Sequence, residues 1–164
     1  MDLAALAAPR AIHLTVNGEP RSAVAEPRTL LVHLIRESLG LKATNVGCDT
    51  SSCGACTIML DGQSVKWCTV LAVQAEGCTI TTVEGISDGE TMHPMQRAFH
   101  ASHALQCGFC TPGMVMAAIG LLDENPHPTA VEVRHGLEGN ICRCTGYQNI
   151  VEAVMAVAQS RAAG

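Results

Sequence analysis

Apolar and polar residues alternate along the first half of the chain, which is the pattern of half-buried β-strands. Residues 12–16 alternate in this way and lead into Asn17-Gly18, a dipeptide typical of two-residue hairpin turns. Further strands are predicted at residues 22–25, 57–60, 63–67 and 78–83. Apolar residues recur at helical spacing over residues 30–39, and Thr29 is the expected N-cap of that helix. The pattern therefore predicts a sheet packed on one helix.

The second half changes to helical periodicity after a predicted linker at residues 85–89. Four helices are predicted: residues 95–103, residues 114–124, one after a capping box at 129–132 and one after a capping box at 145–148. Thr111 is expected to cap the second of them, with Pro112 in its first turn. The apolar stripe of the last helix is Ile150, Val151, Val154 and Val157. We therefore predict an α+β chain, with a first domain at residues 10–86 and an all-α four-helix domain at residues 87–164.

Composition limits the classes of protein that these elements could build. Hydrophobic residues make up 48% of the 164 residues and charged residues 15%, whereas disordered chains combine low hydrophobicity with high charge. The formal net charge is -5 and there is no basic cluster, so nucleic acid is not an expected partner. No apolar run approaches the ~20 residues of a membrane span. Because the run at residues 3–8 is too short for a signal-peptide core, we expect a cytoplasmic protein.

Nine cysteines stand out in a chain expected to stay in a reducing compartment. The first cysteine set is Cys48, Cys53, Cys56 and Cys68. Its Cys-x4-Cys-x2-Cys spacing with a distant fourth cysteine is the plant-type [2Fe–2S] pattern, whereas structural zinc usually uses paired Cys-x2-Cys knuckles. Gly47 and Gly54 are expected to let the loop turn tightly and to bring backbone N–H groups near the sulfurs. The first cysteine set therefore predicts a [2Fe–2S] cluster, with zinc as the alternative.

The second cysteine set is Cys107, Cys110, Cys142 and Cys144. Its spacing alone is compatible with an iron–sulfur cluster, with a zinc site, or with a thioredoxin-like redox pair at Cys107 and Cys110. A redox pair would leave Cys142 and Cys144 without a role. Helix starts are predicted just after both cysteine pairs, and helix N-termini favour anions such as a thiolate-ligated cluster.

Three runs occur in this order along the chain: GCDTSSCGAC at 47–56, QCGFCTPGM at 106–114 and NICRCTGY at 140–147. Together they resemble the small iron–sulfur subunit of the molybdenum hydroxylases, the xanthine oxidase family. The resemblance covers residues 11–158. The residues CDTS at 48–51 and the run at 64–75 are most similar to the small subunits of aerobic carbon monoxide dehydrogenase and of bacterial N-heterocycle hydroxylases.

The resemblance implies a ferredoxin-like β-grasp domain followed by the four-helix domain, each with one [2Fe–2S] cluster. It implies that the second cysteine set holds the cluster nearer a molybdopterin cofactor in a large subunit. The first cysteine set would hold the cluster nearer FAD in a medium subunit. Gln106 matches a glutamine beside the pterin in this family. The family also implies a dimer of heterotrimers, in which this chain relays electrons from molybdenum to flavin. The expected complex is of the carbon monoxide dehydrogenase type, and the alternative is a molybdenum hydroxylase of another substrate, such as an N-heterocycle.

Other residues are expected to be structural. Cys78 belongs to neither set and is interpreted as a small buried hydrophobe. Met114 and Met116 are interpreted as core residues, and Trp67 as packing at the first cluster or at a subunit border. The three histidines at 93, 100 and 103 lack the spacing of a Rieske site and are placed on a solvated helix face.

Two competing functions remain at this stage. One is a free-standing ferredoxin-like carrier, and the other is a zinc-stabilised scaffold without redox chemistry. No nucleophile–base arrangement and no phosphate loop is evident in the sequence. We therefore expect an oxidoreductase subunit that performs no substrate chemistry by itself. A face around Phe109, Met114 and Tyr147 is expected to contact the large subunit.

Overall fold

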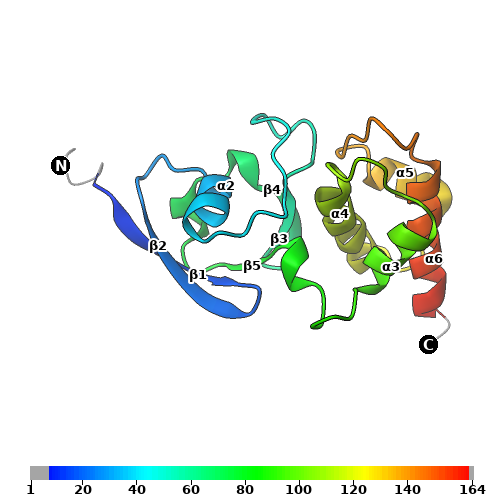
Figure 1. The fold of residues 1–164 in the computed structure, drawn as a ribbon, viewed down its shortest axis with the longest axis horizontal. Coiled ribbons are helices and arrows are strands. Elements are labelled where there is room, and N and C mark those ends of the chain that lie inside the picture. The colour runs from blue at the N-terminus through cyan, green and yellow to red at the C-terminus, as the bar shows by residue number, and fades with distance from the viewer. Residues whose placement is uncertain (1–7, 163–164) are drawn as a thin grey trace.

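The computed structural model describes residues 8–162, and nearly all of the run at residues 3–8 lies outside that range. Its first half is a five-stranded sheet in the order β2-β1-β5-β3-β4. The strands are β1 (Arg10–Val16), β2 (Glu19–Ala25), β3 (Thr57–Leu60), β4 (Gln63–Lys66) and β5 (Thr79–Thr81). β1 and β5 are parallel at the centre, and the other neighbouring strands are antiparallel. Figure 1 has this sheet on one side and the later helices on the other.

Both predicted hairpins are present. Asn17 and Gly18 have φ of 52° and 81°, and Asp61 and Gly62 have φ of 48° and 81°. Two successive positive φ angles are typical of the type I′ turn, whose twist matches that of the flanking strands. The strand returning from the first turn begins at Glu19, earlier than the predicted residue 22.

The strand predicted at residues 78–83 is shorter in the structure. The Asn17 side chain accepts a hydrogen bond from the backbone N–H of Thr82 at 2.9 Å and donates one to its hydroxyl at 3.0 Å. These bonds take Thr82 out of the sheet ladder, and the 3₁₀ turn η4 (Val83–Gly85) follows directly.

The helix predicted at residues 30–39 consists of α2 (Leu31–His33) continued by the π-helical turn η1 (Leu34–Ser38). The prediction that Thr29 caps it is wrong, because Leu30 occupies the N-cap position and makes no side-chain capping bond. The Thr29 carbonyl instead accepts a hydrogen bond from Ala72 N–H at 2.8 Å, which keeps this segment extended. A contact with a distant segment has overridden the local capping preference.

The core of the sheet half is built by residues from β1, α2, β3 and the turns η2 (Trp67–Thr69) and η3 (Ala72–Ala75). Its largest fully buried side chain is Trp67. Trp67 therefore packs inside the sheet half, and its expected place at a subunit border is wrong. The core also contains Cys56 and Cys68, so half of the first cysteine set is embedded in it.

Four helices form the second half: α3 (Pro94–Ala101), α4 (Thr111–Glu124), α5 (Ala130–Gly136) and α6 (Gln148–Ala162). His93 caps α3 by accepting the Met95 N–H at 3.1 Å, so it is not on a solvated helix face as expected. Thr129 and Glu132 form the predicted capping box of α5. The predicted cap of α4 is wrong by one residue, because Cys110 is the N-cap and Thr111 is already helical.

The capping box predicted at residues 145–148 does not form. Tyr147 has a φ of 69°, which no helical residue adopts, and α6 begins only at Gln148. The Gln148 side chain donates a hydrogen bond to Glu152 and accepts one from Arg134. The Thr145 hydroxyl accepts the Tyr147 N–H at 3.2 Å. The predicted apolar stripe of α6 is buried at all four positions.

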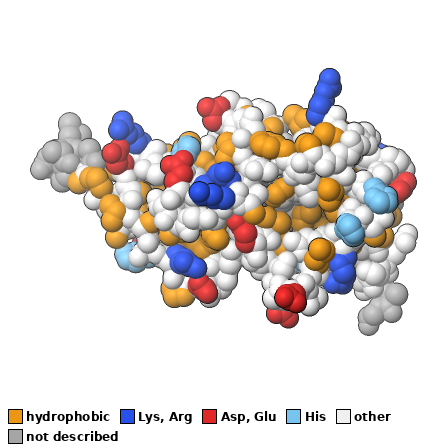
Figure 2. Space-filling view, in the orientation of Figure 1, with side chains coloured by type: hydrophobic (Ala, Val, Ile, Leu, Met, Phe, Trp, Pro, Cys, Tyr) orange, Lys and Arg blue, Asp and Glu red, His pale blue; other side chains and the backbone are white. Residues whose placement is uncertain are grey.

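The helical core contains Met114 and Met116, both fully buried as predicted. Met59 of β3 belongs to the same cluster, and α4 packs on β3 and β4, so this helix joins the two halves. The α+β class is thereby confirmed. Within residues 8–162, no helix is both long and apolar enough to span a membrane. Charged side chains of both signs are scattered over the face in Figure 2 without one dominant patch.

Candidate functional site

The first cysteine set lies on the loop before β3 and on the turn η2. The backbone N–H of Cys53 points at the Cys48 sulfur, with a nitrogen–sulfur distance of 3.4 Å. Gly54 has a φ of 71°, as expected for the residue that turns this loop. Gly47 matters for its lack of a side chain, because a Cβ there would lie 3.2 Å from the Cys53 sulfur. The two glycines therefore shape the loop around the sulfurs.

The four sulfurs of this set lie in contrasting surroundings. Backbone N–H groups of Thr50 and then Cys53 lower the pKa of the half-buried Cys48 thiol to about 6. Burial raises the pKa of the Cys56 thiol to about 12, and the neighbouring thiols of Cys68 and Cys53 add to this rise. The loop thus offers donors that stabilise a thiolate, and it brings Cys53, Cys56 and Cys68 close enough to interact.

The second cysteine set is built from two loops. One precedes α4 and carries Cys107 and Cys110, and the other precedes α6 and carries Cys142 and Cys144. The sulfurs of Cys107 and Cys144 are 3.5 Å apart, although they are 37 positions apart in sequence. The Thr145 hydroxyl donates to the Cys142 sulfur at 3.2 Å.

In this set too, hydrogen bonds lower the pKa of some thiols and burial raises the pKa of others. The backbone N–H of Phe109 is the main cause of a lowered pKa at Cys107, and burial raises the pKa of Cys110 to about 12. At Cys142 burial acts to raise the pKa, but donors from Thr145 and Cys144 outweigh it and the pKa is lowered. The structure therefore brings the four predicted residues together, and their role as ligands stays a prediction.

Each cysteine set offers four thiols, which is the donor set of a [2Fe–2S] cluster. Within residues 8–162, no three His, Cys, Asp or Glu side chains are arranged to hold one metal ion. A structural zinc site needs four ligands converging on one point, whereas a [2Fe–2S] cluster shares four thiolates between two irons. Among the described residues, two of the three buried side-chain polar atoms without a partner are Trp67 Nε1 and Thr111 Oγ1, and these residues directly adjoin Cys68 and Cys110. The four thiols of each set, with a backbone N–H at Cys48 and a hydroxyl at Cys142 donating to sulfur, fit a thiolate-ligated cluster.

Other predicted residues have mixed outcomes. Gln106 is exposed on the loop between α3 and α4, next to Cys107. Cys78 is partly buried against the sheet core, apart from both sets. Phe109 is 48% exposed and Tyr147 36%, but Met114 is fully buried, so the expected contact face does not include Met114.

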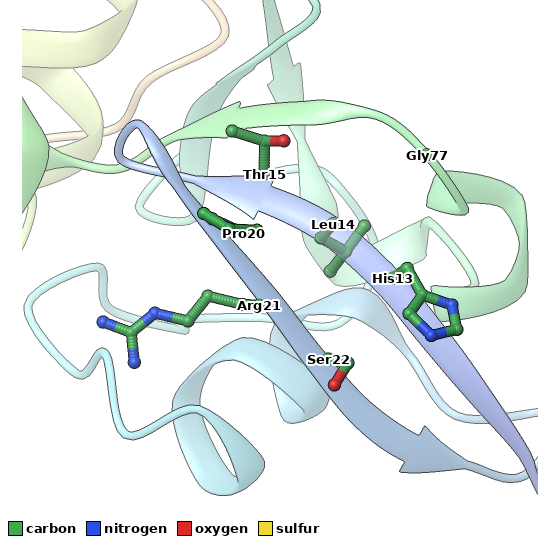
Figure 3. A pocket seen from close by; sticks show the side chains of 7 residues that line it. All are labelled: His13, Leu14, Thr15, Pro20, Arg21, Ser22 and Gly77. Atoms are coloured by element: carbon green, nitrogen blue, oxygen red, sulfur yellow. The ribbon is translucent and has the colours of Figure 1, made fainter.

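A separate hollow lies on the β1–β2 hairpin. Figure 3 places side chains of His13, Pro20, Arg21 and Ser22 along it, from two adjacent strands, and they do not converge on one point. No cysteine lines it. The candidate chemistry of the chain therefore stays with the two cysteine sets.

Sequence reasoning missed residues that support the sulfurs from outside the two sets. The Tyr147 hydroxyl accepts the Cys142 N–H at 2.8 Å. Asn140 is buried, and its side chain donates to the Gly54 carbonyl at 2.9 Å. Asn45 donates to the Phe109 carbonyl at 2.9 Å. Asn140 opens the run NICRCTGY at 140–147, and its place in that run is the signal in the sequence that could have marked it.

Comparison with known proteins identifies two cluster-binding domains. A model described as a 2Fe-2S iron-sulfur cluster binding domain matches residues 14–83, and one described as a [2Fe-2S] binding domain matches residues 82–155. The nicotine 6-hydroxylase small subunit of Paenarthrobacter nicotinovorans is 49% identical, over 88% of this chain and 87% of its own. The xanthine dehydrogenase iron-sulfur-binding subunit of Escherichia coli O157:H7 is 46% identical, over 88% of this chain and 91% of its own.

Further relatives agree in length and fold. The caffeine dehydrogenase subunit gamma of a Pseudomonas species is 46% identical, over 89% of each chain. A chain in the crystal structure of quinoline 2-oxidoreductase from Pseudomonas putida 86 is 49% identical and superposes with a TM-score of 0.90. That superposition covers 95% of this chain and 98% of the other.

Proposed function

The chain belongs to the iron–sulfur subunits of the molybdenum hydroxylase family, and on this premise we propose that it is the electron-transfer subunit of such a complex. When bound, its two [2Fe–2S] clusters accept and release single electrons between a molybdopterin cofactor in a large subunit and FAD in a medium subunit. The observation that carries the proposal is the gathering of eight cysteines into two sets of four on neighbouring loops.

We propose that each cysteine set holds one cluster in its own domain. The first set serves a ferredoxin-like β-grasp domain at residues 10–86, and the parallel β1–β5 pair covered by α2 supports this description. The second set serves the four-helix domain at residues 87–164. In both, backbone N–H groups and the Thr145 hydroxyl hold the thiolates by hydrogen bonds, which stabilise their negative charge.

The surface beside the second set supports a partner on that side. Phe109, Ile141 and Tyr147 are all at least one-third exposed, and each adjoins or lies near a cysteine of this set. A covering subunit would bury these side chains and exclude water from the sulfurs. Gln106, exposed next to Cys107, is in our proposal the side chain that contacts the pterin.

The named relatives favour one substrate class for the whole complex. Their names refer to nicotine, caffeine, xanthine and quinoline, which are nitrogen heterocycles. We therefore propose an N-heterocycle hydroxylase, assembled as a dimer of heterotrimers in the reducing cytoplasm. Carbon monoxide is the second candidate, because the residues CDTS at 48–51 are similar to those of that branch.

Metal analysis of the chain purified with its partner subunits tests the proposal. We expect four iron atoms per chain, no stoichiometric zinc, and two distinct EPR signals after reduction. Substrate turnover is expected only from the assembled complex. Two iron atoms per chain, a colourless zinc protein, or turnover by the isolated chain would each refute the electron-transfer assignment.

A further inference from the structure

The loops that carry the two cysteine sets are hydrogen-bonded directly to each other. The Cys53 carbonyl accepts the N–H of Ile141 at 2.8 Å, so a residue of the first set is bonded to the neighbour of Cys142. A second bond joins Asn45 to the Phe109 carbonyl, between Cys107 and Cys110. In Figure 1 the cyan loop before β3 and the orange loop before α6 accordingly rise at the same end of the molecule.

Asn140 is the buried side chain at this joint. It is only 6% exposed, and its Nδ2 donates to the Gly54 carbonyl at 2.9 Å and to the Thr57 hydroxyl at 3.2 Å. Thr57 also donates to the Gly54 carbonyl at 2.7 Å. An amide placed in this way ties the loop before α6 to the loop before β3, 86 positions away in sequence.

Glycines allow the two backbones to approach so closely. A Cβ on Gly54 would lie 2.4 Å from the Gly139 carbonyl, and a Cβ on Gly113 would lie 2.4 Å from the Gly54 carbonyl. The Gly54 peptide is therefore enclosed by α4 on one side and by the Gly139-Asn140 segment on the other. Because packed backbone cannot yield as a flexible side chain does, this joint has one defined geometry.

We propose that Asn140 is a positioning residue that fixes the second cysteine set relative to the first. The proposal rests on the proposed function, since it concerns the placement of two clusters. Asn140 ligates nothing. Its two hydrogen bonds hold the segment leading into Cys142 and Cys144 against the loop of Cys53, and so set the separation and orientation of the two sites.

Two substitutions distinguish the hydrogen bonds of Asn140 from the space that its side chain fills. Asn140→Asp keeps the shape but removes both N–H donors and brings an oxygen to the Gly54 carbonyl. Asn140→Ala removes the side chain and with it the tie between the two loops, while the Gly54 carbonyl keeps its two hydrogen bonds from Thr57. Asn149→Ala is the matched control, because Asn149 also bonds a backbone carbonyl, that of His103 at 3.3 Å, but within the helical half.

The experiment measures the magnetic interaction between the two clusters after reduction with dithionite, by EPR on the full chain in its complex. Dipolar coupling between two spins falls with the cube of their separation and depends on orientation, so it reports placement and not iron content. In Asn140→Asp and Asn140→Ala we expect a smaller dipolar splitting in the EPR spectrum and a wider spread of splittings. In Asn149→Ala we expect the splitting of the parent. Iron per chain is measured on the same samples.

The outcomes distinguish the inference from the function it rests on. A parent with fewer than four iron atoms per chain would refute the two-cluster function itself. A parent with four, and unchanged coupling in both Asn140 variants, would overturn the positioning role alone. If an Asn140 variant loses iron, the inference requires that the cluster of the second cysteine set is lost. The EPR signal of the first cluster must then be retained. Loss confined to the first set would overturn it.

Discussion

The candidate ligands differ in how readily each gives up its proton. Backbone donors lower the pKa of Cys48 to about 6, whereas burial raises the pKa of Cys56 and Cys110 to about 12. Metal–thiolate bonds require deprotonated sulfur, so binding at Cys56 and Cys110 must displace a proton from each. Backbone donors therefore favour the thiolate form at Cys48, whereas burial opposes it at Cys56 and Cys110.

Single substitutions test which cysteines belong to which set. Cys48→Ser should abolish or cripple only the first cluster, and Cys144→Ser only the second, because each removes one of four ligands. Iron per chain and the two EPR signals measure the result. Cys78→Ser is the control and should keep the parent iron content, since Cys78 lies apart from both sets. Loss of both signals from either ligand variant would contradict the division into two sites.

Gln106→Ala tests the proposed pterin contact. The exposed side chain is not part of a cysteine set, so both clusters should be retained. Reduction of the clusters by substrate should slow, because a hydrogen bond toward the partner's cofactor is lost. Stopped-flow measurement of cluster bleaching in the assembled complex gives the rate, and reduction by dithionite serves as the control. Bleaching by substrate at the parent rate would exclude the contact.

At the scale of elements, the helix starts are decided by different forces. α5 begins with a local capping box, in which Glu132 accepts the Thr129 N–H at 2.6 Å and its hydroxyl at 2.8 Å. α4 begins directly after Cys110 and α6 begins four positions after Cys144, and neither uses the threonine expected to cap it. Near the second cysteine set, the conformation of the cysteine loops therefore decides where each helix begins, and local threonine capping does not.

The capping box of α5 predicts a pH-dependent contribution to stability. Hydrogen bonds from the Thr129 N–H and then its hydroxyl hold the pKa of Glu132 below its ordinary value. A lowered folded-state pKa stabilises the fold above the unfolded pKa, about 4.3, and that contribution is lost as pH falls through the folded value. In urea unfolding, the stability gap between the parent and Glu132→Gln should therefore be largest near neutral pH and shrink in acid. A gap independent of pH would contradict it.

On the scale of the whole molecule, the two halves behave as one body because α4 and the cysteine loops connect them. α4 packs on β3 and β4, and Met59 of β3 is buried in the helical core. The Gly54 peptide is the point at which both connections meet.

Gly113→Ala should loosen this connection. The new Cβ would lie 2.4 Å from the Gly54 carbonyl and 2.7 Å from the Ala55 carbonyl. Alanine gains about 1 kcal/mol in helix propensity over glycine, but overpacking against backbone costs about 1–3 kcal/mol or more. We expect a net loss in the free energy of unfolding, measured by circular dichroism in denaturant. Gly120→Ala, facing only the Ser64 and Met59 side chains, should lose less. A Gly113→Ala variant as stable as the parent would be inconsistent with the close contact.

Sequence reasoning succeeded where the cause was local and failed where it was distant. The Asn17-Gly18 turn follows from two adjacent residues, whereas the ligand role of the two cysteine sets stays a prediction. The cap of α2 could not be predicted, because the Thr29 carbonyl is engaged by Ala72 far along the chain. Gly54 was predicted as a turn, but its contact with Asn140 depends on how the halves pack.

The position of β5 in the sheet also determines when the sheet can close during synthesis of the chain. β5 is the last strand in sequence yet lies at the centre, where it pairs with β1 and β3. As the polypeptide leaves the ribosome, Cys48 through Cys68 therefore emerge before the sheet that will enclose them can close. Asn140 emerges later still. The first cysteine set thus stays unenclosed until β5, at Thr79–Thr81, has emerged, and the joint between the two sets can form only after Asn140 follows.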